Sequence, residues 1–433
     1  MRYFSTNRKS EHVGFKDAVL RGQPEDGGLY FPEKIPHHDV TFWEKLSDKT
    51  KEDIAFELIK PYVGKDIDPQ TLYQICSETV NFDFPLVKLT DSVYALELFH
   101  GDTLAFKDVG ARFMSRCLRF FAQKIGKKIL VIVATSGDTG SAVASGFWNM
   151  ENIEVFILYP KSRISDIQEL QITSLGGNIN SIRVTGDFDD CQRLVKQALA
   201  DEEIREKFYL TSANSINIAR LLPQQFYYAF AYRQWAESQP PAVSVPSGNF
   251  GNICALAIAH LSGLPCERLI AACNSNDVIP EFLRTGKLTS KPAIKTLSTA
   301  MDIASPSNFV RIFQLFENNI EKLRAKMVAF SISDEDTILT MKQTYQSCGY
   351  LLDPHGAVGL KALERYLQQN PSSKGIFLET AHPIKFESVK NILGEASIEI
   401  PPQIRSLLSR KKHYIEVEND YKKLKDLIMS CDS

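Results

Sequence analysis

Short apolar runs alternate with amphipathic segments through the middle of this chain of 433 residues. The runs typical of buried strands are 128–134, 154–159, 181–184, 208–211, 242–246, 269–272 and 375–378. The segments with a helical pattern are 109–124, a small-residue segment from 141, 164–175, 189–199 and 253–261. This alternation predicts βαβ units and a mainly parallel sheet, with ligands at the carboxyl ends of its strands.

The same pattern divides the chain into three regions. Residues 1–90 are less regular, with a turn signal at Asp26-Gly27-Gly28, and we expect an N-terminal layer there. Residues 128–214 are expected to form a small domain, and 91–127 together with 215–433 a larger one. The charged segment from about residue 400 has a helical pattern. The predicted fold class is therefore α/β, with two domains of mainly parallel twisted sheets flanked by helices and a cleft between them.

The composition excludes several classes of protein. The 50 Lys and Arg residues balance 52 Asp and Glu residues, for a formal net charge of -2, so we expect no nucleic acid and no anionic membrane surface as partner. No apolar run is long enough to cross a bilayer, and the first residues lack a signal-peptide core, so we expect a soluble cytoplasmic protein. The eight cysteines include no Cys-x-x-Cys pair, and His100, His355 and His382 share no ligand spacing, so no metal is expected.

A glycine-rich turn lies between the predicted strand 242–246 and the predicted helix 253–261. Its sequence is Gly248-Asn249-Phe250-Gly251-Asn252. Such a turn presents backbone N–H groups at the positive end of a helix, where a phosphate binds. It lacks the Gly-Lys-Ser/Thr of a Walker A loop and the spacing of Gly-x-Gly-x-x-Gly. The turn therefore indicates a phosphate whose carrier is not clearly ATP or a dinucleotide.

One lysine lies where covalent chemistry is expected. Lys107 lies among apolar residues of the segment 99–108, just before the predicted helix 109–124. Apolar surroundings disfavour the ammonium form, and an imine-forming lysine needs a neutral amine. The alternative is a surface lysine that covers apolar neighbours with its stem, which is the more common situation.

Two polar segments follow predicted strands. The turn 135–140 offers hydroxyls and backbone N–H groups to a carboxylate or phosphate oxygen, or else it only caps the helix that follows it. The segment 214–220 ends in an arginine that can clamp a second anion, or else it is a solvated loop with a helix cap. Cys254 is interpreted as a small buried apolar residue and not as a nucleophile.

Taken together, these segments resemble the threonine synthase family, which belongs to the tryptophan-synthase-β (fold type II) group of pyridoxal-phosphate enzymes. The resemblance covers nearly the whole chain. The segments that carry it are Tyr3-Phe4-Ser5-Thr6, 22–32, 100–108, 134–140, 214–220, 246–252 and Glu379-Thr380-Ala381-His382-Pro383. The combination of Asp-Gly-Gly-Leu-Tyr-x-Pro with Phe-Lys-Asp is specific to this group.

The resemblance implies pyridoxal 5'-phosphate as cofactor, bound in the cleft between the domains through a Schiff base with Lys107. It places Thr380 opposite the pyridine nitrogen, and His382 near the pocket. Asp138 falls where some relatives carry an asparagine beside the 3′-oxygen, and an aspartate there needs a proton or a nearby cation. The residues implied for the cofactor phosphate are Gly248, Asn249, Phe250, Gly251 and Asn252.

The resemblance also implies the substrate O-phospho-L-homoserine, which reacts with water to give L-threonine and phosphate by β,γ-elimination and replacement. The residues implied for the α-carboxylate are Ser136, Gly137 and Thr139. Those implied for the substrate phosphate are Thr135, Asn214, Ser215, Arg220 and Asn249. Among these we favour Arg220, because a guanidinium pairs bidentately with phosphate oxygens. The family closes its small domain over the substrate, and the segment 298–308 is either a moving loop or an ordinary connector.

Three other functions remain open. An amino-acid dehydratase or β-replacement lyase of the same group should lack both the anion site at 214–220 and the N-terminal Asp-Gly-Gly-Leu-Tyr segment. A phospholyase that makes a 2-oxo acid would use the same groups, and only its product distinguishes it. A non-catalytic pyridoxal-phosphate-binding paralogue has no physical reason to keep Lys107, Thr380 and Arg220 together. We expect a monomer or a homodimer.

Overall fold

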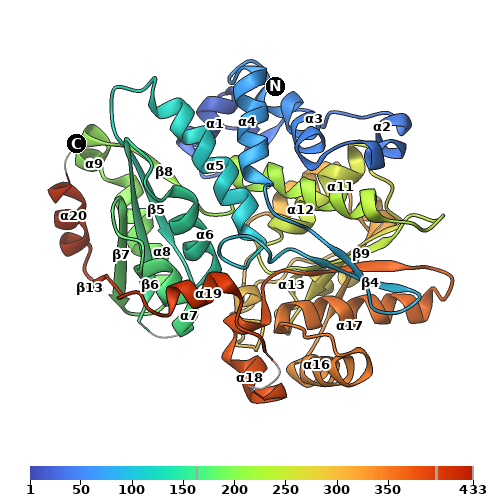
Figure 1. The fold of residues 1–433 in the computed structure, drawn as a ribbon. Coiled ribbons are helices and arrows are strands. Elements are labelled where there is room, and N and C mark those ends of the chain that lie inside the picture. Colours follow the sequence, from blue (N-terminus) through green and yellow to red (C-terminus); the bar gives the residue numbers. More distant parts are fainter. Residues whose placement is uncertain (162–163, 395–397, 432–433) are drawn as a thin grey trace.

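The computed structural model describes residues 1–161, 164–394 and 398–431. Two groups of strands, each flanked by helices, lie side by side, and the N-terminal helices pack along one edge of both (Figure 1). This arrangement confirms the predicted α/β class with mainly parallel sheets.

The larger sheet has six strands in the order β11-β10-β9-β12-β4-β3. Its strands are β3 (Leu86–Lys88), β4 (Val93–Glu97), β9 (Ala242–Pro246), β10 (Arg268–Cys273), β11 (Met327–Ser331) and β12 (Gly375–Glu379). All neighbouring pairs are parallel except β3 and β4. Because parallel strands end at one edge, the segments after β9 and β12 emerge together.

The smaller sheet has five parallel strands in the order β13-β7-β6-β5-β8. These strands are β5 (Ile129–Ala134), β6 (Ile153–Pro160), β7 (Ile179–Thr185), β8 (Tyr209–Ser212) and β13 (Ile415–Glu418). The predicted helical pattern after residue 400 is therefore wrong at 415–418, where pairing with β7 imposes a strand. The predicted domain ranges stay a prediction. They assign residues 415–418 to the larger domain, whereas β13 pairs with β7 in the smaller sheet.

Residues at the N-terminus form a layer outside both sheets. Strands β1 (Tyr3–Ser5) and β2 (Tyr30–Pro32) pair antiparallel. The helices of this layer are α1 (Phe15–Arg21), α2 (Val40–Glu44), α3 (Lys51–Val63) and α4 (Pro69–Thr79), with the short 3-10 helix η1 (Leu46–Asp48). The Asp26 carboxylate accepts hydrogen bonds from the backbone N–H of Lys9, Ser10 and Gly28, which folds the Asp-Gly-Gly segment against β1.

Helices cover both faces of the smaller sheet. Side chains of β5 alternate between two cores, with Val131 and Val133 facing the core that contains α5, and Leu130 and Ile132 facing the core that contains α8. The helices of this part are α5 (Lys107–Ala122), α6 (Asp138–Phe147), α7 (Asp166–Thr173), α8 (Phe188–Ala200), α9 (Glu202–Lys207), α19 (Pro402–Leu407) and α20 (Tyr421–Ser430). The helix expected from 141 begins at Asp138, because Gly137, at φ 146°, turns the chain three residues earlier.

The remaining helices surround the larger sheet and connect it to the N-terminal layer. They are α10 (Ile218–Leu221), α11 (Gln225–Gln234), α12 (Gly251–Leu261), α13 (Val278–Thr285), α14 (Phe309–Leu315), α15 (Ile320–Lys326), α16 (Asp334–Cys348), α17 (Pro354–Gln369) and α18 (Glu387–Leu393). Short 3-10 helices occur at η2 (Leu222–Gln224), η3 (Thr299–Met301) and η4 (Pro383–Lys385).

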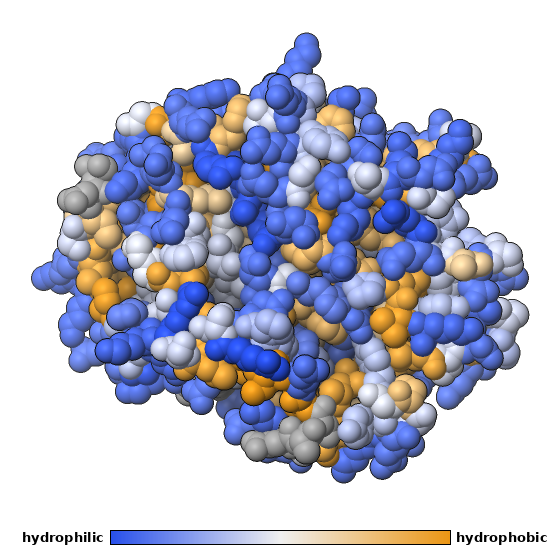
Figure 2. Space-filling view, viewed as in Figure 1, coloured by the Kyte–Doolittle hydropathy of each residue, from blue (hydrophilic) through white to orange (hydrophobic). Residues whose placement is uncertain are grey.

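Hydrophilic residues cover most of the face seen in Figure 2, and apolar residues are scattered over it in small groups. Within the described residues, none of the helices has the length and apolar content needed to cross a membrane.

Candidate active site

Lys107 is the first residue of α5, and its segment is fixed to the segment that follows β12. The Phe106 N–H donates to the Thr380 carbonyl at 2.8 Å, and the His382 N–H donates to the Leu104 carbonyl at 3.0 Å. These bonds hold Lys107 and Thr380 on neighbouring backbone segments, although they lie far apart in the sequence. The two residues predicted for the ends of one cofactor are thus brought to one place.

The Lys107 side chain is mostly buried, with 18% of its surface exposed, and its Nζ lies 3.7 Å from Asp138 Oδ2. Burial lowers the pKa of Lys107 because the ammonium form loses its hydration. Asp138 opposes this shift, while the nearby cations Lys385 and Arg220 reinforce it. The lysine predicted from sequence therefore has the environment that favours a neutral amine.

Asp138 begins α6 and is held by two further partners. Its Oδ1 accepts from Lys385 Nζ at 2.7 Å and from Gln168 Nε2 at 2.9 Å. Burial alone would raise the pKa of Asp138, but Lys385, Lys107 and the hydrogen bonds hold it well below its usual range. The cation that an aspartate requires at this position is therefore Lys385.

The turn 135–140 is organised by the hydroxyl of Thr135. This hydroxyl accepts from the N–H groups of Gly137 at 3.0 Å and Gly140 at 2.8 Å, and it donates to the Gly137 carbonyl. Gly137 has a φ of 146°, which favours glycine, and a Cβ there would also lie 2.6 Å from the side chain of Gln168. The structure thus places Thr135 inside the turn, whereas Ser136 is exposed and Thr139 is partly exposed.

The turn 248–252 connects β9 to α12. Phe250 precedes the helix in the left-handed region, at φ 60°, and no side chain caps the helix there. The Asn252 side chain is buried, and its Oδ1 accepts from the Tyr228 hydroxyl at 2.6 Å. Its Nδ2 finds no hydrogen-bond partner among the described residues. An uncapped helix start with a buried unpartnered donor fits a phosphate group.

Asn249 connects this turn to the segment 214–220. Its Nδ2 donates to Ser215 Oγ at 2.6 Å, and its Oδ1 accepts from the Ser307 N–H and hydroxyl, each at 2.7 Å. Asn308 approaches the same Ser215 hydroxyl at 3.4 Å. Two of the residues predicted for substrate phosphate are therefore in contact, and the segment 298–308 packs directly against them. Asn214 is partly buried, and its Oδ1 has no partner among the described residues.

Arg220 is the last of the predicted anion-binding residues, and only 4% of it is exposed. Its guanidinium donates to the Ala213 carbonyl, its Nε has no partner among the described residues, and none of the ion pairs found there includes it. Burial lowers the pKa of Arg220 to about 10. It packs against Gly110, whose Cβ would lie 3.0 Å from its Nε. A buried cation without a carboxylate is costly, and a bound anion would offset that cost.

Comparisons with known proteins agree with this geometry. Family models match three stretches: "Threonine synthase N terminus" at 2–80, "Pyridoxal-phosphate dependent enzyme" at 82–378 and "Threonine synthase, C-terminal" at 356–428. The chain is 41% identical over 432 residues to the threonine synthase of Haemophilus influenzae, which covers 99% of this chain and 100% of that protein. The chain belongs to the threonine synthase family.

Solved structures of the threonine synthase family have the same fold. The crystal structure of threonine synthase from Escherichia coli superposes with a TM-score of 0.92 at 39% identity, covering 99% of each chain. The pyridoxal-phosphate-bound threonine synthase from Brucella melitensis superposes with a TM-score of 0.91 at 33% identity, covering 99% of this chain and 98% of that one. As a member of this family, the protein is a pyridoxal-phosphate-dependent lyase that acts on a small molecule.

Sequence reasoning missed two buried cations of this threonine synthase family member. Lys385 is fully buried in η4, and Arg311, also fully buried, donates to the carbonyls of Tyr30 and Ile216 and to Asn308 Oδ1, at 2.7 Å each. A lone lysine or arginine carries no periodic signal in the sequence. For Lys385, the apolar residues on either side, Ile384 and Phe386, were the available sign.

Two other residues behave as structural side chains. Burial raises the pKa of Cys254 to about 12, which agrees with an inert residue within α12. Burial also lowers the pKa of His382 to about 4, and its Nδ1 accepts from the Ile384 N–H. Within the described residues, we find no group of His, Cys, Asp or Glu that could hold a metal ion.

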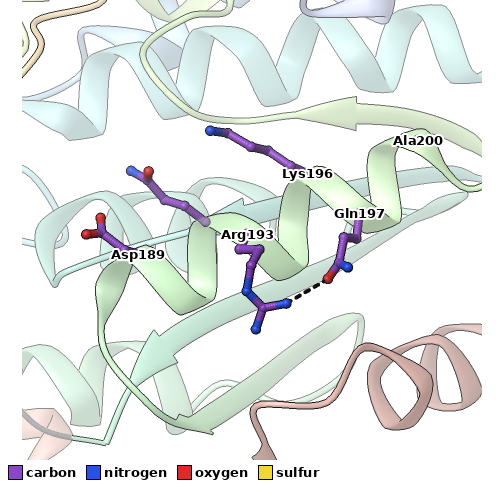
Figure 3. Close-up of a pocket in the computed structure, with 6 residues that line it drawn as sticks. Asp189, Arg193, Lys196, Gln197 and Ala200 are labelled. Carbon is purple, nitrogen blue, oxygen red and sulfur yellow. Dashed lines mark hydrogen bonds between the residues drawn. The ribbon is translucent and has the colours of Figure 1, made fainter.

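A groove of about 470 Å³ runs along α8, and Figure 3 shows the side chains that line it. Its residues are Asp189, Gln192, Arg193, Lys196, Gln197 and Ala200. All belong to one helix face, and α8 covers the opposite face of the smaller sheet from α5. The groove contains none of the predicted site residues, so the chemistry is assigned to the region around Lys107.

Proposed function

We propose that the protein converts O-phospho-L-homoserine and water to L-threonine and phosphate. The observation that carries this proposal is Arg220, a buried guanidinium with no ion-paired carboxylate in the part of the chain that the structure describes. It packs against Gly110, one helical turn after Lys107. A substrate that takes the place of Lys107 on the cofactor and carries its own phosphate would bring the missing anion to this position. We further propose a cytoplasmic monomer or homodimer with the domain ranges predicted above.

Lys107 is proposed to hold the cofactor through its amine. The backbone N–H groups of 248–252, with the free Nδ2 of Asn252, would bind its phosphate, and the Thr380 hydroxyl would face its pyridine nitrogen. When bound, the cofactor supplies an electron sink for negative charge that develops next to the substrate amine. A hydroxyl partner does not keep that nitrogen protonated, so the cofactor would accept negative charge less strongly than it would beside a carboxylate.

The remaining residues are proposed to orient the substrate and move protons. Released from the cofactor by the substrate amine, Lys107 would remove the proton at Cα, because its buried amine is readily deprotonated. Ser136, Gly137 and Thr139 would bind the α-carboxylate at the start of α6. Arg220, Ser215 and Asn249 would bind the phosphate as it leaves Cγ, while Thr135 shapes the turn and Asn214 contributes its amide. Across the whole reaction, a proton and the phosphate leave Cβ and Cγ, water adds its hydroxyl at Cβ, and protons return to Cα and Cγ. Closure of the small domain would exclude other water.

The test uses the purified holoenzyme with O-phospho-L-homoserine. We expect a visible absorbance band that is absent from Lys107→Ala, with threonine and phosphate released one for one. Release of phosphate with a 2-oxo acid would instead identify the phospholyase alternative. Absence of the band in cofactor-supplemented protein would remove Lys107 from its proposed role.

A further inference from the structure

Lys107 is the end of a chain of contacts that includes two further charged side chains. Lys385 Nζ lies 2.7 Å from Asp138 Oδ1, and Asp138 Oδ2 lies 3.7 Å from Lys107 Nζ. Lys385 is fully buried, and 5% of the Asp138 side chain is exposed. One carboxylate therefore lies between two amines in a place with little water.

The three residues come from different parts of the fold. Lys385 lies in η4, just after β12 of the larger sheet, whereas Asp138 begins α6 on the smaller sheet, and Lys107 begins α5. The position of Lys385 is fixed by a second hydrogen bond, from Nζ to the Thr103 carbonyl at 2.7 Å. Gln171 of α7 donates to the same carbonyl at 3.1 Å. Lys385 therefore reaches Asp138 as a preorganised partner and not as a mobile surface lysine.

The charges decide what Lys385 does for Lys107. A buried carboxylate that faces an amine favours the ammonium form, which cannot attack an aldehyde. With Lys385 present, the Asp138–Lys385 pair is neutral overall, so the carboxylate's hold on the Lys107 proton is weakened. Without Lys385, Lys107 would be the one cation among the described residues left in contact with the buried carboxylate of Asp138, and its ammonium form would be favoured.

We propose that Lys385 is a positioning residue that neutralises Asp138, so that Lys107 keeps a neutral amine for cofactor binding. The inference rests on the proposed role of Lys107. The charged groups that face Lys107 are Asp138 of α6, Lys385 of η4, Arg220 of α10 and Asp353, the residue before α17. Of these groups, Lys385 is the one that contacts the Asp138 carboxylate, through the oxygen that does not approach Lys107.

The test measures how fast cofactor-free protein recombines with pyridoxal 5'-phosphate as a function of pH, followed by absorbance. Because only the neutral amine reacts, the midpoint of the pH profile reports the pKa of Lys107. We expect Lys385→Met to raise this midpoint and Asp138→Asn to lower it. A rise of about one pH unit slows recombination about tenfold at neutral pH. The double variant should fall between the single variants.

Lys374→Met is the matched control, since Lys374 pairs with Glu237 and more than a third of its side chain is exposed. It should recombine as the wild type does. An unchanged midpoint in Lys385→Met, or an equal rise in Lys385→Met and the double variant, would overturn the inference. If Lys385→Met alone does not fold, recovery of folded protein in the double variant supports the neutral pair, and failure of both overturns it.

The outcome separates this inference from the proposed function. If wild-type protein forms no band that Lys107→Ala abolishes, the role of Lys107 itself fails. If wild-type protein forms the band but the midpoint of the pH profile is the same in Lys385→Met, only the role of Lys385 fails.

Discussion

Two buried arginines illustrate how a site differs from a structural anchor at the scale of single residues. Arg311 is fully buried and donates to three acceptors. They are the Tyr30 carbonyl of the N-terminal layer, the Ile216 carbonyl, and the side chain of Asn308, the residue before α14. Arg220 is also buried, with 4% of it exposed, but its one hydrogen bond among the described residues goes to the Ala213 carbonyl. Guanidinium groups have five donors, so Arg220 retains the capacity to bind an anion.

We therefore expect Arg220→Met to reduce kcat/KM for O-phospho-L-homoserine about 100-fold or more, because hydrogen bonds to a charged group contribute about 1.5–3 kcal/mol each. The melting temperature of ligand-free protein should stay equal or rise, since an apolar side chain replaces an unpaired buried charge. Arg311→Met should show a lower melting temperature. Steady-state kinetics and thermal unfolding of both variants check this, and a loss of stability in Arg220→Met would contradict it.

The carboxyl of Asp108 gives a pH-dependent prediction. Burial raises its pKa to about 6, against hydrogen bonds from the Thr103 N–H and hydroxyl that lower it. The unfolded chain ionises near its ordinary value, so between about pH 4 and 6 only the unfolded state gains charge, and stability falls as pH rises. Urea unfolding at pH 4 and pH 7 should show a loss of about 1–3 kcal/mol that Asp108→Asn lacks. Equal losses in both proteins would contradict the assignment.

At the scale of elements, the two helices that begin at the predicted anion sites lack the side-chain cap found on several other helices. Helices α3, α7 and α8 begin with a reciprocal capping box. Helices α6 and α12 are preceded by Gly137 and Phe250, which have positive φ and provide no side-chain cap. In α6 the Gly140 N–H already donates to the Thr135 hydroxyl, so the N–H groups of Asp138 and Thr139 are the ones left for a ligand, whereas no described side chain caps the start of α12. Uncapped N–H groups are what anion binding at a helix start requires.

Gly248 offers a test of this arrangement. A Cβ at this position would lie 2.6 Å from the Met301 Cα and 3.0 Å from the Ala300 carbonyl oxygen, so Gly248→Ala must displace η3 or the turn. We expect the affinity for pyridoxal 5'-phosphate to fall at least about tenfold, or about 1.4 kcal/mol. Gly126→Ala is the control, because a Cβ there has nothing within 4 Å. Equal cofactor affinity in the two variants, measured by absorbance titration, would count against the turn as the phosphate site.

At the scale of the whole molecule, sequence reasoning identified what local patterns encode. The β-branched run of β5 and the glycine-rich turn before α12 have clear local signals, so both were placed correctly in the chain. Strand β13 has a short signal of its own, the alternation Ile-Glu-Val-Glu at 415–418, but it lies within a charged segment that was interpreted as helical. Lys385 was missed because its partner, the Asp138 carboxylate at the start of α6, lies far from it in the sequence.

The long-range pairing of β13 predicts how the smaller sheet responds to substitution. Val417 is buried in the core beneath α8, whereas Ile415 on the same strand is 43% exposed. Val417→Asp should lower the free energy of unfolding by about 2–4 kcal/mol, because it buries an unpaired charge. Ile415→Asp is the matched control and should change it by less than about 0.5 kcal/mol. Denaturant unfolding checks both, and equal effects would show that β13 contributes little to this core.

The pairing of β13 with β7 also has a consequence for synthesis on the ribosome. The two strands are separated by more than two hundred residues, so β7 emerges long before its neighbour. At about 5–20 residues per second, the open edge of β7 waits roughly 10–50 s for β13. Unpaired strand edges are templates for aggregation. During that interval, Arg183, the one charged residue of β7, and cellular chaperones are what can keep this edge from pairing with another chain.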